Sequence, residues 1–192
     1  MTRARPLRPR AWRRFLRSAT GGATVEFVIV FPLFVAIFMS SFEASMLLIR
    51  QLMLDRALDV TMREVRVSPG QTFPRDIMRR DICDAARILP DCETSLVVEI
   101  TPIGRQTYAL PNGGATCVER GGAALPGGNH TSGVPDQLML VRACYTVRPF
   151  FPSSILGTEL VRDSASEGEY SIAAASAFSQ EPGRTTINGF TP

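Results

Sequence analysis

The longest apolar run of the chain lies near its N-terminus. Between Phe27 and Phe42 sixteen residues carry no formal charge, and nearly all of them are apolar. If Glu43 is tolerated, the run reaches Ile49. A helix over this stretch is about 35 Å long at about 1.5 Å per residue, which crosses a hydrocarbon core of about 30 Å with some tilt. The pattern predicts a membrane-spanning helix over about 27–49.

Beyond the span, the apolar positions take the spacing of an amphipathic helix. Residues three, four or seven positions apart form one stripe, and the charged residues lie away from it. The stripe consists of Leu47, Leu54, Leu58, Thr61 and Val65. Because Ser68, Pro69 and Gly70 end the pattern, we expect one continuous helix over 22–67. Packing of the stripe against the chain's own domain is the expected arrangement, and contact with a neighbouring subunit is the alternative.

The rest of the chain predicts a short helix and a small sheet. Helical spacing marks 74–89, and strand patterns occur in 94–101, 137–148 and 169–179. In the first two strands one face is apolar and comprises Leu96, Val98 and Ile100, then Met139, Val141, Ala143, Tyr145 and Val147. Residues 111–135 are rich in Gly and Pro and are expected to be loop. The expected fold class is α+β, with the long helix packed on an antiparallel sheet.

Charge divides the chain into two parts. Residues 1–21 hold seven of the 21 Lys+Arg and none of the 18 Asp+Glu, so the remainder has 14 basic and 18 acidic residues, a net charge of −4. Since cations that flank a span stay on the cytoplasmic side, we expect the N-terminus inside and the C-terminal domain outside. A nucleic-acid-binding arm is the rival interpretation of the arginines. Anionic lipid already accounts for them, and we expect no nucleic-acid partner.

A cleaved signal peptide has a similar layout of basic and apolar regions. Here the apolar stretch exceeds the usual length of about 7–15 residues, and no clean small-x-small cleavage site precedes Arg50. The Arg13-Arg14 pair lacks the spacing of a twin-arginine signal. We therefore expect the helix to remain as a membrane anchor.

The cytoplasmic end of the span has the sequence GGATVEF over 21–27. A carboxylate at the head of a span is costly, so it usually has a partner or a task. A glycine, then glutamate as the fifth residue after it, then an aromatic residue and an apolar helix resemble the type IV prepilin processing site. On this resemblance a membrane aspartyl protease, the prepilin peptidase, cuts between Gly21 and Gly22, and Glu26 is the fifth residue of the product. The alternative is an interfacial Glu26 solvated by water or headgroups.

More of the chain resembles one pilin-related family. The sequence TVEFVIVFPLF, with Pro32 inside the span and Glu43 beyond it, is similar to the TadE-like proteins of tight-adherence (Tad) pilus systems. Residues 170–178, YSIAAASAF, and the Gln-Glu-Pro after them resemble the closing strand of that family. The resemblance covers about 22–65 and 137–182 and is absent from the middle.

The resemblance implies a minor pilin or pseudopilin of a Tad-type pilus, held in the bacterial inner membrane and used in pilus assembly or adhesion. It implies association with other pilus subunits, and we expect Glu26, Pro32 and Glu43 to lie at subunit contacts. The expected segments are a basic cytoplasmic leader, the long helix, a periplasmic domain and a flexible tail, over 1–21, 22–67, 68–182 and 183–192. An uncleaved, membrane-anchored accessory protein with a partner in the envelope is the alternative.

All four cysteines follow the span, on the side expected to be oxidising. Four cysteines allow three pairings, and the sequence does not decide among them. We favour Cys83 with Cys92, which closes a helix end onto its following turn, and Cys117 with Cys144, which ties the glycine-rich loop to a strand. A zinc site is disfavoured because the chain has no C-x-x-C motif and one histidine.

Catalytic motifs are missing from the sequence. There is no G-x-S-x-G, phosphate-binding glycine loop, H-E-x-x-H or dinucleotide fingerprint. His130, the single histidine, lies in the glycine-rich stretch and is expected to be a solvated loop residue. We expect no catalytic residue, no metal, no cofactor and no small-molecule substrate, and a membrane-tethered enzyme is the least favoured class.

Overall fold

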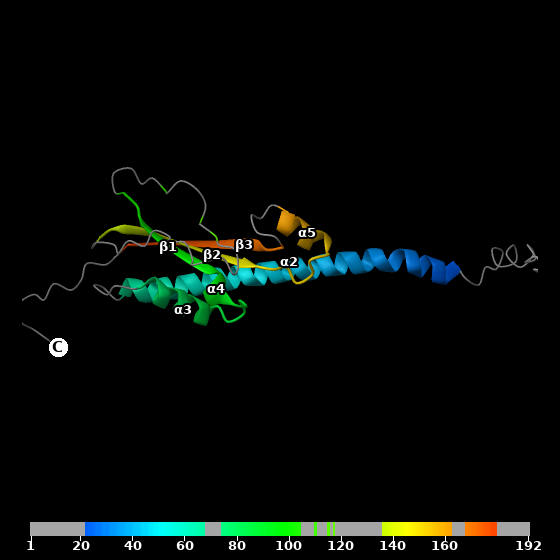
Figure 1. The fold of residues 1–192 in the computed structure, drawn as a ribbon, viewed down its shortest axis with the longest axis horizontal. Coiled ribbons are helices and arrows are strands. Elements are labelled where there is room, and N and C mark those ends of the chain that lie inside the picture. The colour runs from blue at the N-terminus through cyan, green and yellow to red at the C-terminus, as the bar shows by residue number, and fades with distance from the viewer. Residues whose placement is uncertain are drawn as a thin grey trace, which may run out of the picture. The chain divides into compact units, whose positions relative to one another are not determined.

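The computed structural model describes residues 22–67, 74–104, 110, 115, 117, 136–162 and 168–179. Its described elements are four helices and three strands, in the order α2, α3, α4, β1, β2, α5, β3 (Figure 1). This is the α+β class expected from the sequence. The chain divides into two compact units, Met1–Met39 and Ser40–Pro192, which are described separately below.

The long helix α2 spans Gly22–Val67, the bounds expected from the sequence. In the first unit its side chains are exposed from Gly22 to Phe34, and Pro32 lies inside the helix. In the part of the chain that the structure describes, this helix alone is long and apolar enough to cross a membrane, and its most apolar window is unburied within the protein. An exposed helix of this kind requires lipid or other helices around it.

The second unit is built on a three-stranded antiparallel sheet of order β1-β2-β3. The strands are β1 Leu96–Pro102, β2 Leu138–Val147 and β3 Tyr170–Ser179, within two residues of the predicted segments. In the register, Val98 of β1 faces Ala143 of β2, which faces Ala174 of β3. The apolar faces predicted for the first two strands are buried as expected.

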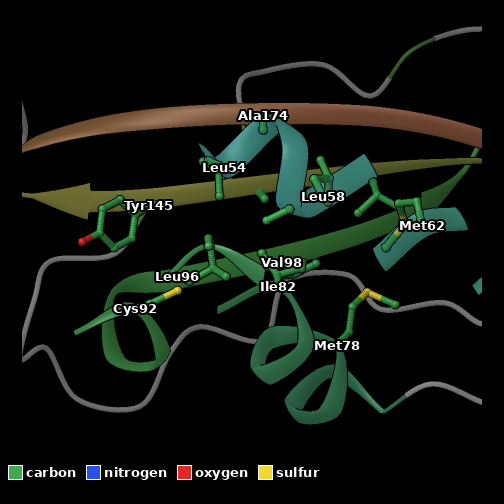
Figure 2. Packing of buried hydrophobic residues seen from close by; sticks show 14 of the residues in the cluster. Leu54, Leu58, Met62, Met78, Ile82, Cys92, Leu96, Val98, Tyr145 and Ala174 are labelled. Atoms are coloured by element: carbon green, nitrogen blue, oxygen red, sulfur yellow. The ribbon is translucent and has the colours of Figure 1, made fainter. Parts of the chain in front are cut away.

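The core lies between this sheet face and two helices. Figure 2 shows side chains of α2 next to those of β1, with α3 contributing from the same side. The buried residues of α2 include Leu54, Leu58, Thr61, Met62 and Val65. The predicted stripe therefore packs against the chain's own domain, as expected.

The shorter helices differ from expectation. Helix α3 covers Arg75–Ala85 and ends four residues before the predicted limit, because Ala86 leaves helical geometry with φ −96° and ψ 53°. The start of the predicted first strand is instead the helical turn α4, Cys92–Ser95. The sequence analysis did not predict α5, Ile155–Arg162.

Two disulfides connect these elements. Cys83 at the end of α3 bonds to Cys92 of α4, and Cys117 bonds to Cys144 of β2, with Cα–Cα distances of 5.6 and 5.3 Å. This is the pairing that the sequence analysis favours. The predicted leader and tail lie outside the described residues, as do His130 and nearly all of the 111–135 loop.

Candidate functional site

The residues of the predicted processing motif lie at the start of α2. Gly21 is outside the described residues, and Gly22 is the first residue of the helix. A Cβ atom built on Gly22 would meet no other atom within 4 Å. Glu26 and Pro32 are both exposed in the first unit. These positions are therefore open to a peptidase, lipid or another subunit.

Glu43 is placed differently, inside the second unit. Its side chain is fully buried, at 0% exposure. Its Oε1 accepts a hydrogen bond from the backbone N–H of Phe150 at 3.1 Å, and its Oε2 accepts one from Phe151 at 2.8 Å. A carboxylate that accepts backbone N–H bonds from two successive residues fixes their position, because charge-assisted hydrogen bonds are stronger than neutral ones.

The segment that Glu43 holds is residues 148–154, which we name the aromatic turn. The rings of Phe150 and Phe151 pack edge to face with centroids 4.9 Å apart, and both contact Phe42 of α2 at 5.3 and 5.5 Å. The turn leads into α5, where a Cβ on Gly157 would collide with the carbonyl oxygen of Phe151. This close approach explains the glycine at the first turn of α5.

A second buried polar residue of α2 binds the sheet. Arg50 is 6% exposed, and its Nη1 donates to the hydroxyl oxygen of Tyr170 at 2.8 Å and to the carbonyl oxygen of Arg148 at 3.2 Å. Next to it, Gln51 donates to the carbonyl oxygen of Ala173 at 2.9 Å. The helix is thus attached to β3 and to the end of β2 by polar bonds as well as by the apolar core.

The charges of this cluster balance. Arg148 pairs with the buried Glu169 at 3.2 Å. The positive charges of Arg50 and Arg148 therefore equal in number the negative charges of Glu43 and Glu169. Burial raises the pKa of Tyr170, and the hydrogen bond and positive charge of Arg50 oppose that shift. The phenol therefore stays neutral at ordinary pH and accepts from the guanidinium. We name Glu43, Arg50, Arg148, Glu169 and Tyr170 the helix-attachment cluster.

This arrangement corrects one expectation. We expected Glu43 to lie at a subunit contact, but both of its carboxylate oxygens are engaged by its own chain and none of its surface is exposed. It positions the aromatic turn. Glu26 and Pro32 remain the predicted contact positions.

The cluster has no evident catalytic chemistry. Its hydrogen bonds tie backbone and side chains of one domain together, and no nucleophile is activated by a neighbouring base. Within the described ranges, no group of three or more His, Cys, Asp and Glu side chains is placed to hold a metal ion. The arrangement positions a helix against a sheet.

Sequence reasoning missed most of this cluster. Arg50 was interpreted as the residue that ends the apolar run, and Tyr170, Arg148 and Glu169 were given no role. A signal was present, since Glu43 and Arg50 are seven residues apart and therefore share one helix face. Two opposite charges on one face of an apolar helix predict a polar partner on that side.

Comparisons with known proteins agree with the helix. The family model described as TadE-like protein matches residues 21–63. The match begins at Gly21 and covers most of α2. Searches of curated proteins and of solved structures return no match. The match does not extend to the sheet. Over residues 21–63 the resemblance seen in the sequence is confirmed, and these residues are similar to TadE-like proteins, whereas the resemblance over 137–182 stays a prediction.

Proposed function

We propose that this protein is a minor pilin or pseudopilin of a Tad-type pilus that acts by association with other pilus subunits. In this proposal residues 1–21 lie in the cytoplasm, α2 crosses the inner membrane and the sheet lies in the periplasm. The observation that carries it is the TadE-like match to a helix whose apolar side chains are exposed. The protein has a structural role in pilus assembly and performs no catalysis.

The apolar surface of α2 extends further than a bilayer can cover. We place the span over 22–42 instead of 27–49, because Glu43 is buried within the sheet domain. Residues 22–42 as a helix are about 31 Å long, which already fills a hydrocarbon core of about 30 Å. Leu48 and Leu52 are both 65% exposed, yet Leu52 lies about 15 Å beyond Phe42 along the helix. These two leucines are one turn apart, so they form one exposed patch. The patch supports a contact with a neighbouring protein helix, since lipid does not reach it.

Glu26 gives the association a chemical basis at the other end of the helix. If the peptidase cuts before Gly22, the new amine is about 6 Å along the axis from Glu26. Neither charge is stable alone in lipid. In an array of parallel helices Glu26 of one subunit pairs with the amine of the next, and loss of one partner of such a buried pair costs about 3–5 kcal/mol.

The test compares Glu26→Ala with wild type at matched membrane levels. We expect the variant to insert in the membrane but to lose co-purification with other pilus components, and Glu26→Asp to be partly impaired. The matched control is Glu64→Ala, an exposed glutamate of the same helix outside the apolar segment, which should recover partners normally. The mass of the mature N-terminus reports cleavage. Equal recovery with Glu26→Ala, together with an uncut N-terminus, would favour the anchored accessory protein instead.

A further inference from the structure

We propose that the aromatic turn is a membrane-docking surface. Through it the sheet domain contacts the interface of the same bilayer that α2 crosses. The proposal goes beyond the pilus role and depends on the membrane span alone. The partner that the turn binds is lipid, at the boundary between the headgroups and the acyl chains.

The position of the turn along α2 is the first argument. Phe42 is the last residue of the uncharged run, and a helix from Gly22 to Phe42 already measures about the thickness of the hydrocarbon. Both rings of the aromatic turn pack on Phe42. A segment in contact with Phe42 is therefore at the level where the span leaves the hydrocarbon.

The exposed surface of the turn is the second argument. Phe150 is 55% exposed and Phe42 is 38% exposed, and Ile155, one residue past the turn, is 65% exposed. Exposed aromatic and branched side chains grouped on one turn are costly in water. Aromatic rings are favoured at the membrane interface, where an apolar group enters the lipid and its backbone stays near water.

The backbone of the turn is the third argument. A chain segment enters an apolar environment only if its polar groups are satisfied. The N–H groups of Phe150 and Phe151 both donate to Glu43, and the carbonyl oxygen of Phe151 accepts from the N–H of Ser154 at 3.0 Å. Glu43 thereby removes two donors that would otherwise oppose insertion. This gives a reason for a buried carboxylate at the end of an apolar run.

A cation at the rim of the turn fits the same surface. The Arg148 side chain is 68% exposed although it pairs with Glu169. An exposed arginine two residues before Phe150 is placed to reach lipid phosphate. Exposed aromatic rings and a cation on one short segment are typical of an interfacial anchor.

The experiment reads the depth of the turn with tryptophan fluorescence. Trp12 is the only tryptophan of the chain, so Trp12→Phe gives a silent background. In that background Phe150→Trp is compared with Phe42→Trp, which reports the span, and with Ile77→Trp. Ile77 is 46% exposed and precedes Met78, at the end of the core near Met62 (Figure 2). Met62 lies about 30 Å beyond Phe42 along α2.

The full chain is reconstituted in vesicles of phosphatidylethanolamine and phosphatidylglycerol that contain brominated lipid and no other protein. We expect Phe150→Trp to be quenched at least about twofold more than Ile77→Trp, and more by bromine near the headgroups than by bromine at the chain ends, since interfacial segments insert about 5–10 Å. Retained protease resistance of the sheet domain shows that each variant is folded. Pro152→Trp, at an exposed position of the same turn, is a second reporter if Phe150→Trp does not fold.

The controls separate this proposal from others. Strong quenching of Phe42→Trp with no more quenching of Phe150→Trp than of Ile77→Trp would overturn membrane docking while leaving the span intact. That outcome would show that lipid does not cover the turn. Because the vesicles contain no pilus component, the result does not depend on whether the chain is a pilin.

Discussion

Replacement of Glu43 by alanine is the most informative perturbation of the helix-attachment cluster. The change removes the acceptors of the Phe150 and Phe151 N–H groups, which are partly buried, and leaves the positive charge of Arg50 less compensated. A hydrogen bond to a charged group contributes about 1.5–3 kcal/mol. For two such bonds we expect Glu43→Ala to lower the free energy of unfolding of the sheet domain by about 3–5 kcal/mol.

Glu43→Gln tests the same hydrogen bonds with a smaller change of the side chain. The amide keeps one acceptor oxygen but presents an NH₂ donor to the second N–H, so we expect a loss of about 1.5–3 kcal/mol. Glu64→Ala is the matched control, because it changes the same residue type on the same helix at an exposed site. Its effect should stay within about 0.5 kcal/mol.

The measurement is pulse proteolysis in urea of the full chain in membranes, with the disulfides intact. It reports the folded fraction of the sheet domain at each urea concentration, while the span stays in lipid. If Glu43→Ala and Glu64→Ala have equal midpoints, the two hydrogen bonds of Glu43 contribute nothing net and the helix-attachment cluster is not a stabilising unit.

Three further predictions concern the stability at alkaline pH, the disulfides and the membrane topology. Burial raises the pKa of Tyr170, so the neutral phenol contributes stability that is complete below about pH 10 and is lost as the pH rises through the folded pKa. Tyr170→Phe should cost about 1 kcal/mol at neutral pH and flatten the alkaline loss of stability in urea titrations. Non-reducing mass spectrometry of protein from the envelope should find no alkylatable thiol, and Cys83→Ser should cost about 2–4 kcal/mol; four free thiols would contradict this. Alkaline phosphatase should be active when fused after Pro192 and inactive when fused near Ser18, and activity at Ser18 would reverse the proposed orientation.

The sequence predicted the elements whose periodicity is long or strongly apolar. Helix α2 was predicted with its observed bounds, because the apolar run and the stripe are continuous and Pro69 follows them. The strands were predicted within two residues, because apolar residues at alternate positions of β1 and β2 form one buried face. Helix α5 was missed, since it is eight residues long and offers too few positions to show a period.

The attachment of the helix was less predictable. Glu43 bonds to residues more than 100 positions away, and sequence spacing says nothing about such pairs. The carboxylate was correctly singled out as unusual in an apolar run, but its partner was sought in another subunit. The structure shows that two backbone N–H groups of the same chain satisfy it. A charge in an apolar helix predicts that a partner exists, and the fold decides where that partner lies.

Glu43 and Arg50 have one more consequence for the motion of the helix. They are about 10 Å apart along the axis, on the same side of α2, and each bonds to a different point of the sheet domain. A single attachment point would allow the helix to pivot, but two points oppose rotation about the axis and sliding along it. A rotation by one residue, about 100°, would break both sets of bonds together. A force applied along this part of the helix is therefore transmitted to β3 and to the aromatic turn at the same time. This part of the helix and the sheet then move together as one rigid body.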